Sequence, residues 1–153
     1  MVDGHGGVVI GSEISGGYRN LFVEDCEMSS ANLDRVIRIK TSTTRGGLIE
    51  NIYVRNVRVG ECRESVLRIN LDYEPEERAK RGFTPEVRNV YLENVTCGKS
   101  EYGLWFRGLD DETKINNINI KNCRFDGVSS AEHNYSHGLI GTVNVENLII
   151  NGE

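Results

Sequence analysis

The chain has 153 residues, 38% of them hydrophobic and 27% charged, with a formal net charge of -5. This length and composition suit one globular domain and argue against long disorder. No basic run concentrates the positive charge that nucleic-acid binding requires, and no apolar run reaches the ~20 residues that cross a bilayer. We therefore expect neither a nucleic acid nor a membrane as a partner. The first five residues lack the charged start and apolar core of a signal peptide, so the sequence assigns no cellular location.

A four-residue pattern of Asn, aliphatic, any residue, aliphatic recurs five times along the chain. It begins at Asn20, Asn51, Asn89, Asn117 and Asn147. The alternation is typical of a strand with one buried face. It predicts that the following side chains point inward: Leu21, Val23, Ile52, Val54, Val90, Leu92, Ile118 and Ile120. Asn tolerates left-handed backbone, so these positions suit turns at strand ends, and their side chains can stack as a ladder.

A second alternating strand follows each of the first three copies, at residues 36–40, 66–70 and 103–107. Alignment of the three predicts one outer column of Arg38, Arg68 and Trp105, beside a second column of Lys40, Asn70 and Arg107. Trp105 is read as filling space between turns rather than as a sugar platform. Paired strands that repeat every ~20–40 residues are the signature of a stacked β-solenoid.

Two short motifs gain meaning from their spacing. Gly4-His5-Gly6 alone reads as a turn, and Arg38-Ile39-Lys40 alone reads as a solvated face. However, His5 precedes Arg38 by 33 residues, and Lys40 precedes Tyr73 by 33 residues. One turn of the stack would thus bring an imidazole, a guanidinium, an ammonium and a phenol together, since neighbouring strands are ~4.8 Å apart.

Together, Gly4-His5-Gly6, Arg38-Ile39-Lys40 and Tyr73 after an alternating strand resemble the later active-site motifs of glycoside hydrolase family 28, which includes polygalacturonases. The segment 11–17 resembles the bacterial branch of that family. The resemblance covers nearly all of residues 1–153 and implies the C-terminal part of a right-handed, single-stranded parallel β-helix of about five coils.

The resemblance also implies roles. His5 would support the catalytic carboxylates, Arg38 and Lys40 would bind a galacturonate carboxylate, and Tyr73 would contact the sugar. A planar guanidinium suits a carboxylate because it donates two parallel hydrogen bonds. The implied ligand is pectin or an oligogalacturonate, and no cofactor is implied.

The chain departs from the family because it lacks the Asn-Thr-Asp and Asp-Asp motifs that supply the acid and base of an inverting hydrolase. Only three residues precede Gly4, and Asp110-Asp111 reads as a loop. We expect an N-terminally truncated chain that is inactive alone and self-associates through an uncapped first coil carrying Val8 and Ile10. The alternatives are a non-catalytic uronate-binding module and a purely structural solenoid.

No metal site is expected. Cys26, Cys62, Cys97 and Cys123 form no C-x-x-C pair and are expected to be buried thiols. His133 and His137 have metal-ligand spacing, but no Cys or carboxylate set surrounds them.

Overall fold

The computed structural model describes residues 3–74, 82–129, 133–135 and 138–152. Its regular elements in these ranges are all strands, and no helix there is long and apolar enough to span a membrane. The strands are β1 (Val8–Ile10), β2 (Tyr18–Glu24), β3 (Glu27–Met28), β4 (Arg35–Lys40), β5 (Leu48–Val59), β6 (Ser65–Asn70), β7 (Glu86–Cys97), β8 (Tyr102–Arg107), β9 (Ile115–Lys121), β10 (Arg124–Val128), β11 (His133–Tyr135), β12 (Val143–Glu146) and β13 (Ile149–Gly152).

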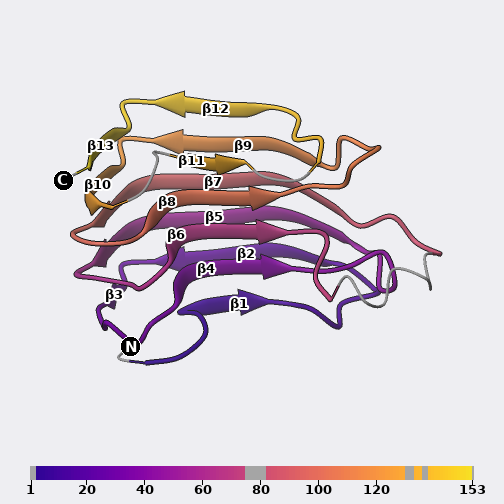
Figure 1. Cartoon of the computed structure of the whole chain (residues 1–153), viewed down its shortest axis with the longest axis horizontal. Coiled ribbons are helices and arrows are strands. Elements are labelled where there is room, and N and C mark those ends of the chain that lie inside the picture. The colour runs from indigo at the N-terminus through magenta and orange to yellow at the C-terminus, as the bar shows by residue number, and fades with distance from the viewer. Residues whose placement is uncertain (1–2, 75–81, 130–132, 136–137, 153) are drawn as a thin grey trace.

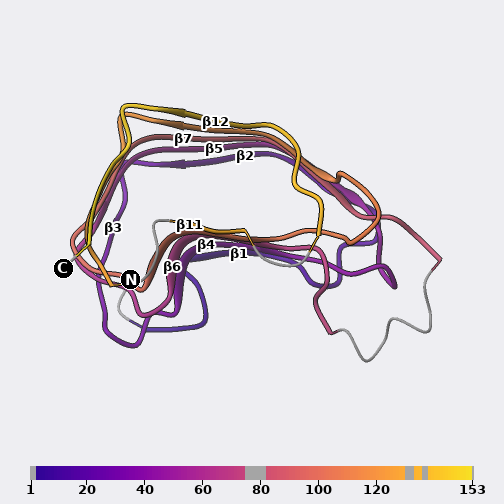
Figure 2. The ribbon, with the colours of Figure 1, turned by 45° about the horizontal axis from the view of Figure 1, so that its top comes forward.

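The strands wind into a parallel β-helix with two principal sheets (Figure 1). One sheet has the order β1-β4-β6-β8-β11, and the other stacks β2, β5, β7, β9 and β12. The long strands β5 and β7 continue around a corner, where β3, β10 and β13 join them. Figure 2 shows the two sheets facing each other across the core. The predicted β-helical fold is therefore confirmed.

Ladders of aliphatic side chains fill the space between the sheets. Each inward position lies above its equivalent one turn earlier, as in Ile52↔Val90 and Val90↔Ile118. Seven of the eight side chains predicted to point inward are buried, and Leu21 on β2 is partly buried. Burial of such a side chain stabilises the fold by about 1.5–3 kcal/mol, so the repeated ladders explain why the alternating segments become strands.

Two columns of Asn and Asp mark the corners of the second sheet. Asn20, Asn51, Asn89 and Asn117 have φ between 53 and 62°, the left-handed region that Asn tolerates. Their amides donate from one turn to the next at 3.1, 3.0 and 2.7 Å, which confirms the predicted ladder. A second column holds Asp25, Asn56, Asn94, Asn122 and Asn147.

The fifth copy of the sequence pattern was placed in the wrong column. Asn147 donates to Asn122 at 3.1 Å and so belongs to the second column, not to that of Asn117. The strand that continues the stack above β9 is β12, with Val143 over Ile118 and Val145 over Ile120. The last turn is shorter than the others. In the earlier turns, both corners of the second sheet have a left-handed Asn or Asp, so the sequence pattern matched the corner after β12 instead of the one before it.

The cysteines behave as expected of buried thiols. Cys62, Cys97 and Cys123 are buried, Cys26 is partly buried, and all four are free. Contact with Cys97 and burial raise the pKa of the Cys62 thiol, and burial raises the pKa of Cys123. Residues 75–81 lie outside the described part of the chain, as does His137.

Candidate uronate-binding face

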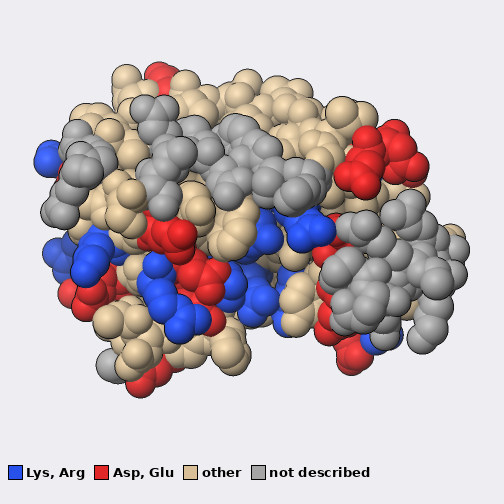
Figure 3. All heavy atoms as spheres, viewed as in Figure 1, with Lys and Arg blue, Asp and Glu red and all other residues tan. Residues whose placement is uncertain are grey.

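The candidate site lies on the outer face of β4, β6 and β8. The register pairs Arg38 with Arg68 and Arg68 with Trp105. It pairs Lys40 with Asn70 and Asn70 with Arg107. Both predicted outer columns are therefore present, and Figure 3 shows basic side chains gathered in the middle of this face with acidic groups at its sides.

Arg38, Lys40 and Tyr73 form one cluster, as predicted. The ammonium nitrogen of Lys40 lies 4.4 Å from the centroid of the Tyr73 ring, and the guanidinium carbon of Arg38 lies 5.6 Å from it. A cation over an aromatic face is stabilised by the ring quadrupole. Both cations therefore lie close to the same aromatic ring.

Among the described residues, no carboxylate lies within ion-pair distance of Arg38 or Lys40. In residues 3–74, 82–129, 133–135 and 138–152, neither Arg38 nor Lys40 forms an ion pair. Burial and the charge of Arg35 lower the pKa of Arg38, against the opposing effects of Tyr73 and nearby carboxylates. Two unpaired cations in a partly desolvated place are suited to receive an anion.

The two carboxylates whose charges act on Arg38 are held by other arginines. Asp34 accepts from Arg63 at 2.6 Å and from Arg35 at 3.4 Å. Glu64 pairs with Arg35 and lies 3.6 Å from Arg63. Because these two arginines occupy both carboxylates, Arg38 and Lys40 remain available for a ligand.

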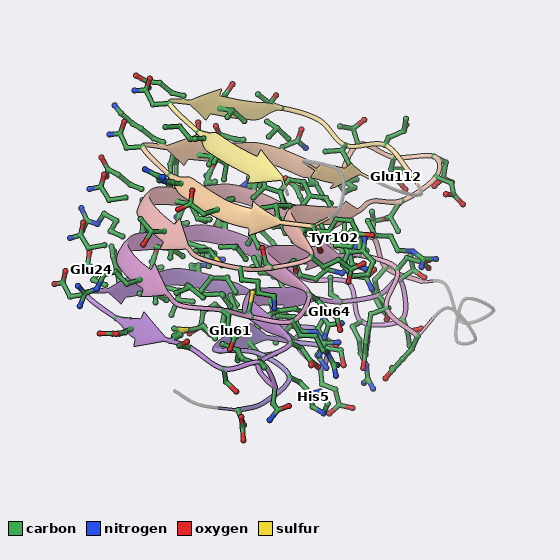
Figure 4. All side chains as sticks on the ribbon, turned by 60° about the vertical axis from the view of Figure 1, so that its left-hand side comes forward. His5, Glu24, Glu61, Glu64, Tyr102 and Glu112 are labelled. Carbon is green, nitrogen blue, oxygen red and sulfur yellow. The ribbon has the colours of Figure 1, made fainter. Side chains whose placement is uncertain are left out.

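His5 lies one turn before β4, as its spacing predicts, but it is not opposite Arg38. The first sheet pairs β1 with β4 at an offset of 29 residues, so His5 lies beside Asp34 rather than Arg38. Its Nδ1 is 2.9 Å from Oδ2 of Asp34. Figure 4 shows His5 on the same side of the stack as Glu64, with Glu24 on the other side. The 33-residue spacing misled because loops between strands differ in length from turn to turn.

Arg68 continues the basic column but is almost buried. Its guanidinium carbon lies 4.0 Å from the centroid of the Trp105 ring, and Nη1 donates to the Trp105 carbonyl at 3.1 Å. Burial, together with the charges of Arg35 and Arg107, lowers the pKa of Arg68 to about 10. Arg68 thus covers one face of Trp105, which is half-buried.

An acidic hollow of about 260 Å³ lies beside the basic face. Its lining includes Asp72, Asp110, Asp111 and Glu112. Asp72 pairs with Arg107 at 2.5 Å, while Asp110 and Asp111 are exposed in the loop between β8 and β9. This negative lining is unsuited to an anionic sugar. Within the described parts of the chain, no group of three or more His, Cys, Asp or Glu could hold a metal ion.

Sequence reasoning missed Asp34, Arg35, Arg63 and Glu64. These residues lie between the motifs and carry charges that read as an ordinary solvated surface. One available signal was the strand alternation: alignment of Val8–Ile10 with Ile37–Ile39 puts His5 level with Asp34.

The fold and the face define a parallel β-helix with an unpaired cationic patch on one outer sheet. The family model "Glycosyl hydrolases family 28" matches residues 1–138, and the chain belongs to that family. It is 28% identical over 137 residues to a polygalacturonase of Ralstonia nicotianae (strain ATCC BAA-1114 / GMI1000), a match that covers 84% of this chain and 25% of the relative. The crystal structure of a hyperthermoactive exopolygalacturonase from Thermotoga maritima superposes with a TM-score of 0.81 at 34% identity, over 97% of this chain and 31% of that one. The chain thus spans a quarter to a third of the length of these relatives.

Proposed function

We propose that this chain binds a galacturonate unit of a pectin-type polysaccharide on the face formed by β4 and β6. Arg38 and Lys40 hold the carboxylate, and Tyr73 contacts the sugar beside them. The observation that carries the proposal is the pair of cations that share Tyr73 and have no carboxylate partner among the described residues. The similar proteins are named polygalacturonase and exopolygalacturonase, which supports polygalacturonate as the substrate. This polymer carries a carboxylate on every sugar unit, and each carboxylate could pair with the cations of the patch.

We further propose that the chain contributes substrate binding to a hydrolase site and does not cleave pectin by itself. An inverting glycosidase needs one carboxylic acid and one carboxylate about 6.5–9.5 Å apart across the bond. Asp34 and Glu64, whose charges act on Arg38, are both held in ion pairs with Arg35 and Arg63. The hydrogen bond from His5 and the charges of Arg63 and Arg35 lower the pKa of Asp34, and an ionised carboxylate has no proton to donate.

Titration calorimetry with digalacturonate tests the binding proposal, with the neutral disaccharide digalactose as the control ligand. We expect binding only for digalacturonate, weakening with added salt because exposed charges are screened. Since a hydrogen bond to a charged group contributes about 1.5–3 kcal/mol, Arg38→Ala and Lys40→Ala should each weaken binding at least tenfold.

A matched control is Arg58→Ala, because Arg58 on β5 pairs with Glu27 away from the face. Equal binding of both disaccharides, or wild-type affinity in Arg38→Ala, would contradict the proposal. The purified chain should also release no reducing ends from polygalacturonate. Hydrolysis that is lost in Arg38→Ala would show that the non-cleaving part of the proposal is wrong.

We also propose that two copies associate through the edge formed by β1 and β2. In the described part of the chain, β1 pairs only with β4, and β2 pairs only with β5. Val9, Tyr18 and Phe22 are exposed along this edge. Unpaired strand edges with apolar side chains favour pairing with another chain.

A further inference from the structure

We propose that Asp34 is a positioning residue for His5. Its carboxylate accepts the Nδ1–H of the imidazole, so Nε2 becomes the nitrogen presented to solvent and to a bound ligand. Only the presence of that ligand rests on the proposed function; the contact itself is a property of this chain.

The geometry singles out this pair. His5 Nδ1 and Asp34 Oδ2 are 2.9 Å apart, and their side chains are 86% and 7% exposed respectively. The buried carboxylate is thus the fixed partner, and the imidazole extends outward from it. An ionised carboxylate only accepts hydrogen bonds, so the bonded ring nitrogen must carry the proton.

The backbone fixes both members of the pair. The amide of Asp34 donates to the Gly4 carbonyl at 2.9 Å, and the amide of Gly7 donates to the Arg35 carbonyl at 2.9 Å. The segment that carries His5 is therefore tied, on both sides of the imidazole, to the segment of Asp34 and Arg35 that leads into β4. Little rotation is needed for the two side chains to meet.

The charge of Asp34 is secured by its other partners. Arg63 and Arg35 donate to the same carboxylate, at 2.6 and 3.4 Å. They stabilise the ionised form and prevent Asp34 from turning toward Arg38. A carboxylate that orients one imidazole nitrogen decides which tautomer the ring adopts, as at histidines whose second nitrogen is bonded by a neighbouring residue.

A purely structural reading is that the pair only fastens residues 3–7 to the stack. A second hydrogen bond already fastens this segment to the stack: Ser30 Oγ donates to Asp3 Oδ1 at 2.6 Å and does not involve His5. A pair in which one partner is this exposed adds little stability. The two readings differ in what happens to the imidazole tautomer.

Long-range proton–nitrogen NMR on the ¹⁵N-labelled chain, under alkaline conditions that leave imidazoles neutral, tests the proposal. We expect wild-type His5 to show a protonated Nδ1 and an unprotonated Nε2. Asp34→Ala should remove this signature and give the Nε2–H form that free imidazole side chains favour. Ser30→Ala, which loosens the same segment without contact to His5, should keep it.

A wild-type His5 in the Nε2–H form would overturn the proposal without any variant, even if Asp34→Ala failed to fold. An unchanged tautomer in folded Asp34→Ala, or an equal change in Ser30→Ala, would also overturn it. Because no ligand is present in these spectra, absence of digalacturonate binding would contradict the proposed function and leave this result intact.

Discussion

At the scale of single residues, the Asn ladder couples backbone conformation to a chain of amide hydrogen bonds. Asn89 donates to Asn51 at 3.0 Å, accepts from Asn117 at 2.7 Å and has a φ of 56°. Asn89→Ala removes two side-chain hydrogen bonds, each contributing about 1 kcal/mol. It also puts an alanine in left-handed backbone, at a cost of about 1–2 kcal/mol.

We therefore expect Asn89→Ala to lower the free energy of unfolding by about 3–4 kcal/mol in urea titrations. Asn89→Gly is the matched variant, because glycine accepts this φ and loses only the hydrogen bonds. The loss of unfolding free energy in Asn89→Gly should be smaller than in Asn89→Ala, and the difference should equal the cost of left-handed backbone for alanine. Equal losses in the two variants would mean that the left-handed conformation contributes nothing here.

Asp34 gives a dependence of stability on pH. Burial acts to raise the pKa of this carboxyl, but the hydrogen bond from His5 and the charges of Arg63 and Arg35 outweigh it and lower the pKa. Because the pKa of Asp34 is lower in the folded chain, its ionised form stabilises the fold fully above the unfolded pKa of about 4. This stabilisation is lost as the pH falls through the lower pKa of the folded chain.

The difference in unfolding free energy between wild type and Asp34→Asn should therefore be large at neutral pH and shrink in strong acid. Chemical unfolding at several pH values measures it. A difference that stayed constant from neutral pH to below about pH 3 would contradict the assignment, because the neutral amide does not titrate in that range.

The site was predictable from the sequence where it depends on local pattern. Arg38 and Lys40 alternate with inward Ile37 and Ile39, so their shared outer face follows from the two-residue period. The partner of His5 was not predictable in the same way. Its position depends on the offset between β1 and β4, which is set by the length of the intervening turns.

At the scale of elements, the two sheets approach closely where a glycine interrupts an inward ladder. A Cβ built on Gly103 of β8 would lie 2.7 Å from Cδ2 of Phe125 on β10. Phe125 is fully buried. The small residue on one sheet thus accommodates the large one on the other, as interdigitated packing requires.

Gly103→Ala should consequently lower the free energy of unfolding by about 1–3 kcal/mol, the usual effect of overpacking. Thermal unfolding measures it, with Gly16→Ala as the control because a Cβ there has nothing within 4 Å. In a Phe125→Leu background the cost of Gly103→Ala should fall, since the ring no longer fills the space. Strictly additive effects would show that the two residues do not compete for it.

Element prediction succeeded where one strand period was repeated many times and failed where the repeat shortened. Ile52, Val90 and Ile118 share one register because each sits one residue after a left-handed Asn. Asn147 carries the same local signal, yet it belongs to the other corner. Both corners use the same residue for the same conformational reason, so local sequence alone does not distinguish them.

At the scale of the whole molecule, the stack separates a basic face from a face of paired charges. On the second sheet, Arg55 pairs with Glu24, and Arg88 lies 2.8 Å from Glu50. Opposite charges alternate there from turn to turn and neutralise one another. On the first sheet, Arg38 and Arg68 follow each other with no acid between them. This asymmetry concentrates positive potential on one side of a chain whose net charge is -5.

Association of two copies through the edge of β1 and β2 would cover an exposed aromatic ring. Phe22 is the outermost ring of a ladder in which it stacks on Tyr53, and Tyr53 on Tyr91, each at 5.0 Å. The ring face that points away from Tyr53 is uncovered, and Phe22 is 59% exposed. Covering such a ring with that of a second copy would continue the ladder and remove apolar surface from water, worth about 25 cal/mol per Å².

We expect size-exclusion chromatography with light scattering to show a mass that rises from one chain toward two with concentration. Phe22→Glu should hold the protein at the mass of one chain, because it would bring two like charges together at the shared edge. Val145→Glu is the matched control: Val145 is 48% exposed on β12, which among the described strands pairs only with β9 at the opposite end of the stack. A wild-type mass of one chain at every concentration would refute association, and loss of the dimer in Val145→Glu instead of Phe22→Glu would move it to the opposite edge.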